Sequence, residues 1–341
     1  MEPVTQVLAS AALSRAGLSR TSRLAPLVLL ATALAPDVDL LSSLGGPDAY
    51  LRYHRTLFHS IAGGAVLAAA IAFGAYIFDR GIRRVRTEGR PLSFGRAYAL
   101  ALIGVAFHII LDLLNSGGVQ LLWPFHEKWF AWSVASDLDL WILTLLAAAL
   151  VLPELFGLVS EEIGERKRKN PARQRWAIAA LALFSIYAIV RVVLHSRAVD
   201  ALNSRTYRGN IPLSAGAFPN SVSPIDWRGV IATDNALIEL DVPLGASGRF
   251  DPESGIFHFK PEPSPALDAA RRTAIARRFL AYARFPLASI EPREDSFHFE
   301  LRDLRLPADS TSHENLIAVV DLDSRLSVLR EELRFPAGHS H

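Results

Sequence analysis

Four apolar segments constrain most strongly what this chain can fold into: 57–78, 95–114, 138–158 and 176–194. Each is about 20 residues long, and a helix of that length matches the roughly 30 Å hydrocarbon core of a bilayer. A shorter apolar run at 24–35 follows three arginines and predicts a fifth, short span. The pattern therefore predicts an α-helical polytopic membrane bundle of about five spans, preceded by a short N-terminal helix.

The run at 24–35 also has features of a cleaved signal peptide, namely preceding basic residues and an Ala-x-Ala sequence at 33–35. Pro36 would hinder cleavage directly after that sequence, and cleavage would leave an acidic motif at the new N-terminus. An uncleaved membrane helix is therefore the preferred interpretation. The sequence leaves open whether residues 3–18 are embedded in the membrane.

Basic residues concentrate in two linkers between the apolar segments, RGIRRVRTEGR at 80–90 and ERKRKNPARQR at 165–175. Basic linkers stay on the cytoplasmic side of a membrane. Simple alternation then places the loops at 45–56 and 115–137, and everything after His195, on the outer side. We expect a multi-pass protein of the bacterial inner membrane with an extracytoplasmic C-terminal domain.

The second part of the chain differs from the first in charge and in pattern. Up to His195 there are 19 Lys and Arg against 14 Asp and Glu, a net +5, whereas from Ser196 onward there are 17 against 20, a net −3. Alternating apolar residues predict strands around one amphipathic helix at 265–285, as in a small α+β domain. The predicted domains are a membrane bundle at 1–195, a linker or arm at 196–223, and a soluble α+β domain at 224–341.

Candidate metal-binding residues gather at the outer ends of the spans. The chain has no cysteine, so a metal site has to use His, Asp and Glu. Pro36 disfavours helix at the residue before it, and on extended chain Asp37 and Asp39 would point the same way. His108 and Asp112 are four residues apart and share one helix face. His59 shares a face with Arg55 at the start of the second span.

Imidazole and carboxylate ligands together suit zinc, with manganese or magnesium as alternatives. The predicted metal ligands are Asp37, Asp39, His59, His108 and Asp112. His54 is predicted as a ligand or general acid and Arg55 as the group that binds an anion such as phosphate. Asn115 and Asp139 are predicted to support the ligands. The number of candidates leaves a two-metal site open, and a metal there would supply hydroxide as nucleophile.

Each residue pair also has a structural interpretation. A single His in a membrane span more often makes a buried hydrogen bond than a bond to metal. An Asp and a His four residues apart on one helix can be an ion pair and nothing more. The prediction of a metal site rests on the predicted topology, which places all these pairs on the same side of the membrane.

Five motifs stand out: PDVD at 36–39, HRTLFHS at 54–60, HIILDLLNSGG at 108–118, WPF at 123–125 and FPNSVSPIDWRGV at 218–230. Together they resemble the bacterial family of membrane-bound metal-dependent hydrolases, over most of the chain. The resemblance implies a compact helical bundle with a site that includes, by position, Asp37, Asp39, His54, Arg55, His59, His108, Asp112 and, by a weaker match, Asp139.

Two positions depart from that family. Thr5 is followed by Gln6 where a Thr-His pair is common, so Gln6 is expected to support the site only weakly. Phe58 stands where a small hydroxyl residue is common. A fainter similarity to zinc-dependent phospholipases C and P1-type nucleases, which use a His-x-x-x-Asp helix pair, favours phosphoester chemistry.

The sequence thus predicts a metal-dependent hydrolase that acts on a phosphoester of a lipid or lipid-linked substrate in the bilayer, with no nucleic acid as partner. Two alternatives stay open. One is a non-catalytic membrane scaffold or sensor stapled by a structural metal. The other is an ion transporter, since intramembrane acids and histidines also mark ion pathways, although transport predicts charges at mid-depth rather than at one end.

Overall fold

The computed structural model describes residues 1–83, 92–162, 171–245, 250–307 and 312–336. The chain forms two compact units. The first consists of Met1–Asp39 and Arg55–Val192, and the second of Leu40–His54 and Val193–His341. The two basic linkers on which the predicted orientation depends lie mostly outside the described residues.

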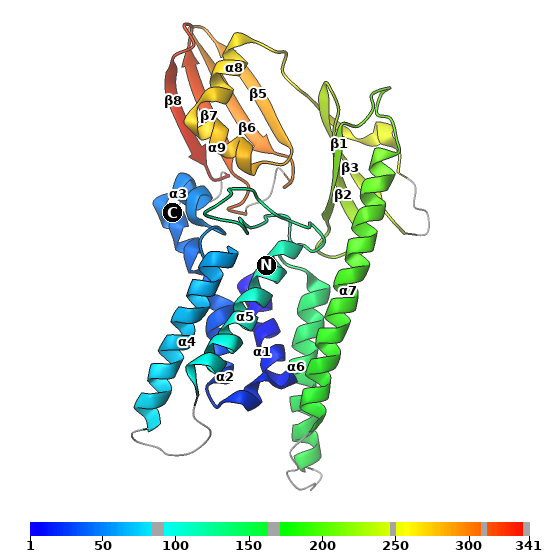
Figure 1. Cartoon of the computed structure of the whole chain (residues 1–341). Helices are drawn as coiled ribbons and strands as arrows, with labels where there is room; N and C mark the ends of the chain where they lie inside the picture. The colour runs from blue at the N-terminus through cyan, green and yellow to red at the C-terminus, as the bar shows by residue number, and fades with distance from the viewer. Residues whose placement is uncertain (84–91, 163–170, 246–249, 308–311, 337–341) are drawn as a thin grey trace. The chain divides into compact units, whose positions relative to one another are not determined.

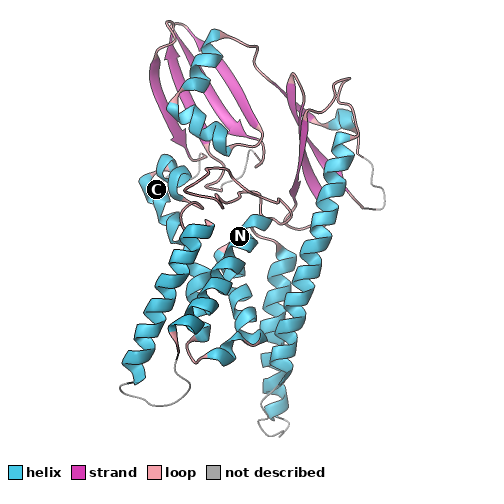
Figure 2. Ribbon diagram, in the orientation of Figure 1, coloured by secondary structure: helices cyan, strands magenta, loops and turns pink. Residues whose placement is uncertain are grey.

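Helices build the first unit (Figures 1 and 2). In chain order the helices up to α7 are α1 (Pro3–Ala16), η1 (Leu18–Thr21), α2 (Ala25–Leu34), η2 (Pro36–Gly45), α3 (Pro47–Tyr53), α4 (Ile61–Arg83), α5 (Phe94–Leu114), α6 (Leu140–Glu162) and α7 (Pro171–Asn203). Five segments of the described chain are long and apolar enough to cross a membrane: Ala25–Gly45, Ile61–Gly81, Phe94–Leu114, Leu140–Gly157 and Arg173–Asn203. The predicted bundle of about five spans with a short N-terminal helix is confirmed.

The helix α5 is the most deeply buried of these five segments. A Cβ atom added at Gly104 would lie 2.0 Å from Oγ1 of Thr32, so α2 approaches α5 over a position that only glycine can occupy. Apolar side chains of α5 complete two core clusters, one with α2 and α4 and the other with α1, α6 and α7. The central helix therefore carries His108 and Asp112 into the interior of the first unit.

The second unit contains two antiparallel four-stranded sheets, with strand orders β1-β2-β3-β4 and β5-β6-β7-β8. The strands are β1 (Ser214–Pro219), β2 (Asp226–Ala232), β3 (Ala236–Pro243), β4 (Ile256–Phe259), β5 (Pro286–Arg293), β6 (Ser296–Asp303), β7 (Ile317–Asp323) and β8 (Val328–Arg334). A short turn of helix, η3 (Pro252–Ser254), precedes β4, and α8 (Pro265–Arg272) and α9 (Ala274–Tyr282) pack on the second sheet (Figure 1). The predicted small α+β domain is confirmed.

Local details of this unit differ from the sequence pattern. The single helix expected at 265–285 is divided, because the Thr273 side chain accepts a hydrogen bond from the backbone N–H of Ala276 and caps α9. The alternation of apolar residues does not predict strands β1 and β5. Strand β1 lies in the segment 196–223, whose Pro, Gly, Ser and Asn residues indicate a linker. The end of α7 also lies in that segment, and the division of the chain into the three predicted domains stays a prediction.

The helix α3 belongs to the second unit although it precedes α4 in the sequence. Tyr50 of α3 packs edge-on against Phe335, with ring centroids 5.8 Å apart, and lies 6.0 Å from the ring of His313. Arg278 of α9 forms an ion pair with Asp48. The second unit therefore holds the middle of segment 36–60, while both ends of that segment lie in the first unit.

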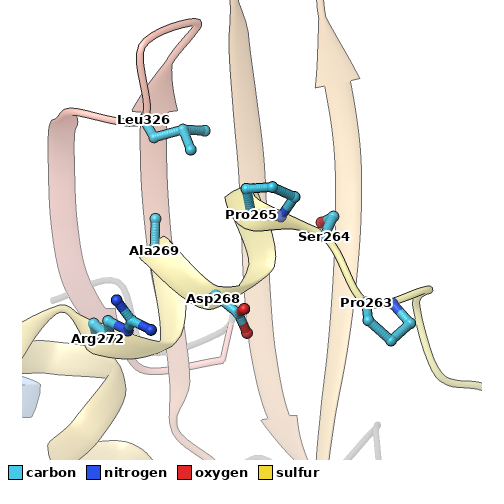
Figure 3. Close-up of a pocket in the computed structure, with 7 residues that line it drawn as sticks. All are labelled: Pro263, Ser264, Pro265, Asp268, Ala269, Arg272 and Leu326. Atoms are coloured by element: carbon cyan, nitrogen blue, oxygen red, sulfur yellow. The ribbon is translucent and has the colours of Figure 1, made fainter.

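An open pocket of about 520 Å³ lies beside the start of α8 (Figure 3). Leu326, from the turn between β7 and β8, faces Ala269 across it, whereas the carboxylate of Asp268 points away from Leu326. The lining contains one acid, one base and one serine, and its other residues are two prolines, an alanine and a leucine. The Asp268 and Arg272 side chains point in different directions, so the pocket lacks the convergent polar groups of a binding site.

Candidate metal centre

Four side chains of the first unit converge on one point: Asp37, His59, His108 and Asp112. One ligand atom from each lies within 4.8 Å of every other, which is the arrangement that could hold a metal ion. Asp37 comes from the first turn of η2, His59 from the loop before α4, and the other two from the last turns of α5. Residues up to 75 positions apart are thus brought together by the packing of α2 and α4 against α5.

The distances among these atoms match the edges of a small tetrahedron. Nε2 of His59 lies 3.3 Å from Nε2 of His108 and 3.6 Å from Oδ1 of Asp37. Nε2 of His108 lies 3.4 Å from Oδ1 of Asp37, and Oδ2 of Asp112 lies 3.0 and 3.5 Å from the two Nε2 atoms. Metal–ligand bonds of about 2.0–2.1 Å in tetrahedral geometry require ligand separations of about 3.3 Å. Five of the six edges therefore fit one ion.

Each of the two imidazole rings is also held by a hydrogen bond at Nδ1, the ring nitrogen that faces away from the centre of the cluster. Nδ1 of His59 lies 3.0 Å from Oδ2 of Asp39, and Nδ1 of His108 lies 3.1 Å from the backbone oxygen of Ala33. Both partners are acceptors, so each Nδ1 carries the proton and each Nε2 presents a lone pair to the centre. Such bonds fix the tautomer and the ring orientation of metal-binding histidines.

Burial makes this cluster costly without a cation. Asp112 and His59 are fully buried and His108 is 1% exposed, whereas the side chain of Asp37 is 18% exposed. When Nε2 of both rings carries no proton, Oδ2 of Asp37 and Oδ2 of Asp112 are buried and accept no hydrogen bond. Unsatisfied buried carboxylate oxygens destabilise a fold, and a divalent cation is the group that would satisfy them. The donor set present therefore fits a metal.

Charge in the cluster also acts on His59, which lies just outside the membrane-spanning helix α4. Burial lowers the pKa of its imidazole, but hydrogen bonds to Asp112, Asp37 and Asp39 outweigh burial and raise that pKa well above 6.5. A metal at this point would compete with that proton for the ring.

Arg55 lies against the same cluster in a strained backbone conformation. Its φ of 55° is in the left-handed region, which non-glycine residues rarely adopt. The conformation is held by its N–H, which donates to Oδ2 of Asp39 at 3.0 Å, and by its carbonyl, which accepts from the N–H of Gln120 at 3.0 Å. The buried guanidinium then lies 3.9 Å from Oδ2 of Asp112 and 3.8 Å from Oδ1 of Asp137.

Two of the predicted supporting residues contact the converging residues or Arg55 beside them. Nε2 of Gln6 donates to Oδ1 of Asp112 at 3.2 Å and to the backbone oxygen of His108 at 3.3 Å. The amino group of Met1 also contacts Oδ1 of Asp112. Asn115 accepts from Arg55 at 3.4 Å through Oδ1 and donates to Asp137 at 2.8 Å through Nδ2.

Two other predicted residues are not among the four that converge. His54 ends α3 and stacks on Tyr50, with ring centroids 4.6 Å apart, and it is not one of the four converging residues. Asp139 caps α6 by accepting from the N–H groups of Trp141 and Ile142, and it also accepts from the hydroxyl of Tyr187. These contacts give Asp139 a structural role at the start of a span.

The expected extended chain after Pro36 is wrong. Residues Pro36–Gly45 form the 3₁₀ helix η2, in which proline is tolerated at the first position because its missing N–H is not needed there. With about three residues per turn, side chains two apart diverge instead of sharing a side. Asp37 consequently faces the two Nε2 atoms, while Asp39 lies behind His59 and orients it.

Sequence reasoning missed three contributors to this site. The carbonyl of Ala33 is a backbone group, so the residue type gives no signal of its role. Gly104 acts only by permitting close packing of α2, which its residue type does not reveal. Asp137 was noticeable as an acid beside a span, and the structure places it at Arg55 and Asn115.

Comparisons with known proteins agree with a membrane protein. The uncharacterized protein YfhP of Bacillus subtilis (strain 168) is 22% identical over 303 residues, which cover 88% of this chain and 82% of the relative. No solved structure matches the chain. The model of the YdjM inner membrane protein family matches residues 1–198, which include all four converging residues. Because that match covers more than half of the chain, the protein is a multi-pass inner membrane protein that belongs to the YdjM inner membrane protein family.

Proposed function

We propose that this protein is a membrane-bound metal-dependent hydrolase that cleaves a phosphoester of a lipid or lipid-linked substrate. The observation that carries the proposal is the tetrahedral spacing of Asp37, His59, His108 and Asp112, with both rings oriented from behind. Mixed imidazole and carboxylate ligands favour zinc, with manganese or magnesium as alternatives. A metal held there would supply a coordinated water whose pKa approaches about 7 and which serves as nucleophile.

Residues around the ligands supply what phosphoester cleavage also needs. We propose that the Arg55 guanidinium, which is buried beside Asp112, binds a phosphate oxygen by charge-assisted hydrogen bonds. Asp37 is the one partly exposed ligand of the four, so we propose that substrate and water reach the centre past Asp37. His54 stays a proposed general acid.

A second function has an observation in its favour. Four protein ligands around one ion is typical of closed, structural metal sites, whereas a catalytic zinc usually keeps one position for water. A metal that staples η2 and the loop before α4 to α5 would suit a non-catalytic scaffold or sensor. The catalytic proposal requires that the coordination expand or that Asp37 leave one position open.

Metal content and turnover measured together distinguish these functions. The full-length protein is purified in detergent without chelators, and bound metal is measured by elemental analysis beside His108→Ala, Asp112→Asn and the matched control His126→Ala, whose side chain is exposed. We expect one divalent ion per chain in the wild type and control, and loss of that ion in the two site variants. Equal metal content in all four proteins would overturn the metal centre.

The same four proteins are assayed with p-nitrophenyl phosphate, bis-p-nitrophenyl phosphate and phosphatidic acid in mixed micelles. Hydrolysis that is lost with the metal and retained in His126→Ala supports the hydrolase. Stoichiometric metal with no hydrolysis of any of the three esters, together with a lowered melting temperature on chelation, would favour the structural metal instead.

We also propose that the metal centre and the second unit face the extracytoplasmic side. The cysteine-free chain allows single cysteines to be introduced at Ser196 and at Thr87 without background. An impermeant maleimide added to intact spheroplasts should label Ser196→Cys and leave Thr87→Cys unlabelled until the membrane is lysed. The reverse pattern would refute this orientation.

A further inference from the structure

The guanidinium of Arg55 lies beside two carboxylates, of which only Asp112 belongs to the metal centre. Its Nε lies 3.9 Å from Oδ2 of Asp112, and its Nη2 lies 3.8 Å from Oδ1 of Asp137. Both distances exceed hydrogen-bond length, so these two contacts act through charge. The side chains of Asp112 and Arg55 are 1% and 9% exposed, whereas that of Asp137 is 43% exposed. Asp137 is therefore the member of this trio that reaches solvent.

The edge of the guanidinium that faces these acids is an edge that binds anions. Nε and Nη2 lie side by side on the planar group and can donate two parallel hydrogen bonds to a carboxylate or a phosphate. A phosphate on this edge would have the ligand Asp112 near one end and Asp137 near the other. The charge of Asp137 therefore acts on any anion that Arg55 binds there.

Although Asp137 is partly exposed, its position is fixed by hydrogen bonds. Its Oδ1 accepts from Nδ2 of Asn115 at 2.8 Å, and its backbone oxygen accepts from the N–H of Glu2 at 3.1 Å. Asn115 is fully buried, and its Oδ1 accepts from the N–H groups of Gly117 and Gly118 at 2.9 and 3.2 Å. A buried amide therefore holds the carboxylate at a fixed place beside the guanidinium.

A fixed negative charge distinguishes phosphate esters by their own charge. A phosphomonoester carries about −1.5 to −2 near pH 7, whereas a phosphodiester has a single ionised oxygen. Coulomb repulsion is proportional to each of the two charges, so a carboxylate opposes the binding of a monoester about twice as strongly in free energy. Asp137 therefore lowers the affinity for monoesters more than the affinity for diesters.

We propose that Asp137 is a specificity-determining residue that directs the site toward singly charged phosphodiesters. This inference rests on the proposed hydrolase function, since it names the class of phosphoester that the same site prefers. A lipid of this class carries a second organic group on its phosphate. If Asp137 served only to hold Arg55 in place, its removal would weaken the binding of both classes of ester.

Removing the charge while keeping the shape tests the proposal. Asp137→Asn keeps an oxygen that can accept from Asn115, and Asp137→Glu keeps the charge. The matched control Glu127→Gln removes an exposed charge of the same sign from the same loop. Metal content, thermal unfolding, and kcat/KM for p-nitrophenyl phosphate and bis-p-nitrophenyl phosphate are measured on the full-length proteins in detergent.

We expect Asp137→Asn to raise kcat/KM by about tenfold for the monoester and about threefold for the diester. A partly exposed charge changes the affinity for one unit charge by up to about fivefold, and it acts twice on a doubly charged ester. The ratio of monoester to diester should thus rise about threefold at unchanged metal content, and Asp137→Glu and Glu127→Gln should keep the wild-type ratio. An unchanged or lowered ratio in Asp137→Asn, or an equal rise in Glu127→Gln, would overturn the proposal.

Binding measured without turnover separates this inference from the hydrolase. Titration calorimetry of the same proteins with inorganic phosphate and with dimethyl phosphate should show Kd falling in Asp137→Asn by about tenfold and about threefold, respectively. If neither ester is hydrolysed but these gains appear, the hydrolase proposal fails and the role of Asp137 in anion selection stands. Equal changes in Kd for the two anions, or no binding of either anion to any of the proteins, would overturn that role.

Discussion

Asp39 is expected to control metal affinity without touching the metal. Its Oδ2 accepts hydrogen bonds from Nδ1 of His59 and from the N–H of Arg55, both at 3.0 Å, so Asp39→Ala removes both anchors in one step. Removing the group that orients a metal-binding histidine typically weakens metal binding by about 10–100-fold, which corresponds to about 1.4–2.7 kcal/mol. Asp39→Asn keeps an acceptor oxygen and loses the charge, so its effect should stay below about tenfold.

The fold itself should also respond to Asp39→Ala. The variant leaves the buried N–H of Arg55 without the acceptor that Asp39 supplies, at a cost of about 1–3 kcal/mol. The lost hydrogen bond also helps to hold Arg55 in its left-handed backbone conformation. Asp39→Ala should therefore melt at a lower temperature even in the absence of metal, whereas Asp39→Asn should melt near the wild type.

The assay is competition for Zn²⁺ against a chromophoric chelator, with purified protein in detergent and thermal unfolding of each variant in the same buffer. The control is Asp234→Ala, which removes an exposed carboxylate from the turn after β2. A folded Asp39→Ala protein that binds Zn²⁺ within about threefold of the wild type would refute the role of Asp39 in orienting His59.

Three further predictions follow from the packing and the charges. Gly104→Ala should lower the free energy of unfolding by about 1–3 kcal/mol because its Cβ would meet Thr32 at 2.0 Å, whereas Gly95→Ala, which has open space, should unfold like the wild type in a thermal melt. Arg305→Ala should destabilise the second unit by about 3–5 kcal/mol in chemical unfolding. In the wild type, Nε of Arg305 lies 3.3 Å from the buried Asp303 carboxylate, and the variant removes this ion pair. The control Arg302→Ala, on the exposed surface, should change the free energy of unfolding by less than about 0.5 kcal/mol. Metal affinity should fall as the pH is lowered, and the fall should begin above pH 6.5 because the raised pKa of His59 lets its proton compete with the metal earlier; affinity independent of pH in a titration would contradict this.

Much of the site was accessible from residue types and spacing. His108 and Asp112 lie four residues apart on a helix, and that local geometry survives any packing of the helix. Asp37 and His59 were identified because polar residues beside apolar spans are costly unless they have partners. The respective roles of Asp37 and Asp39 were not accessible, because a 3₁₀ turn and an extended chain direct side chains two apart in different directions.

The sequence by itself determined the membrane bundle, the small α+β domain and the set of residues that could bind a metal. Each of these follows from apolar length, periodicity or side-chain chemistry, which are properties of short stretches of chain. Tertiary structure alone decided that Gly104 lets α2 approach closely enough for the Ala33 carbonyl to orient His108. It also decided that the middle of segment 36–60 packs in the second unit while its ends reach the metal centre. Such contacts join residues far apart in sequence, and their energies depend on distances of a few tenths of an ångström that no local pattern encodes.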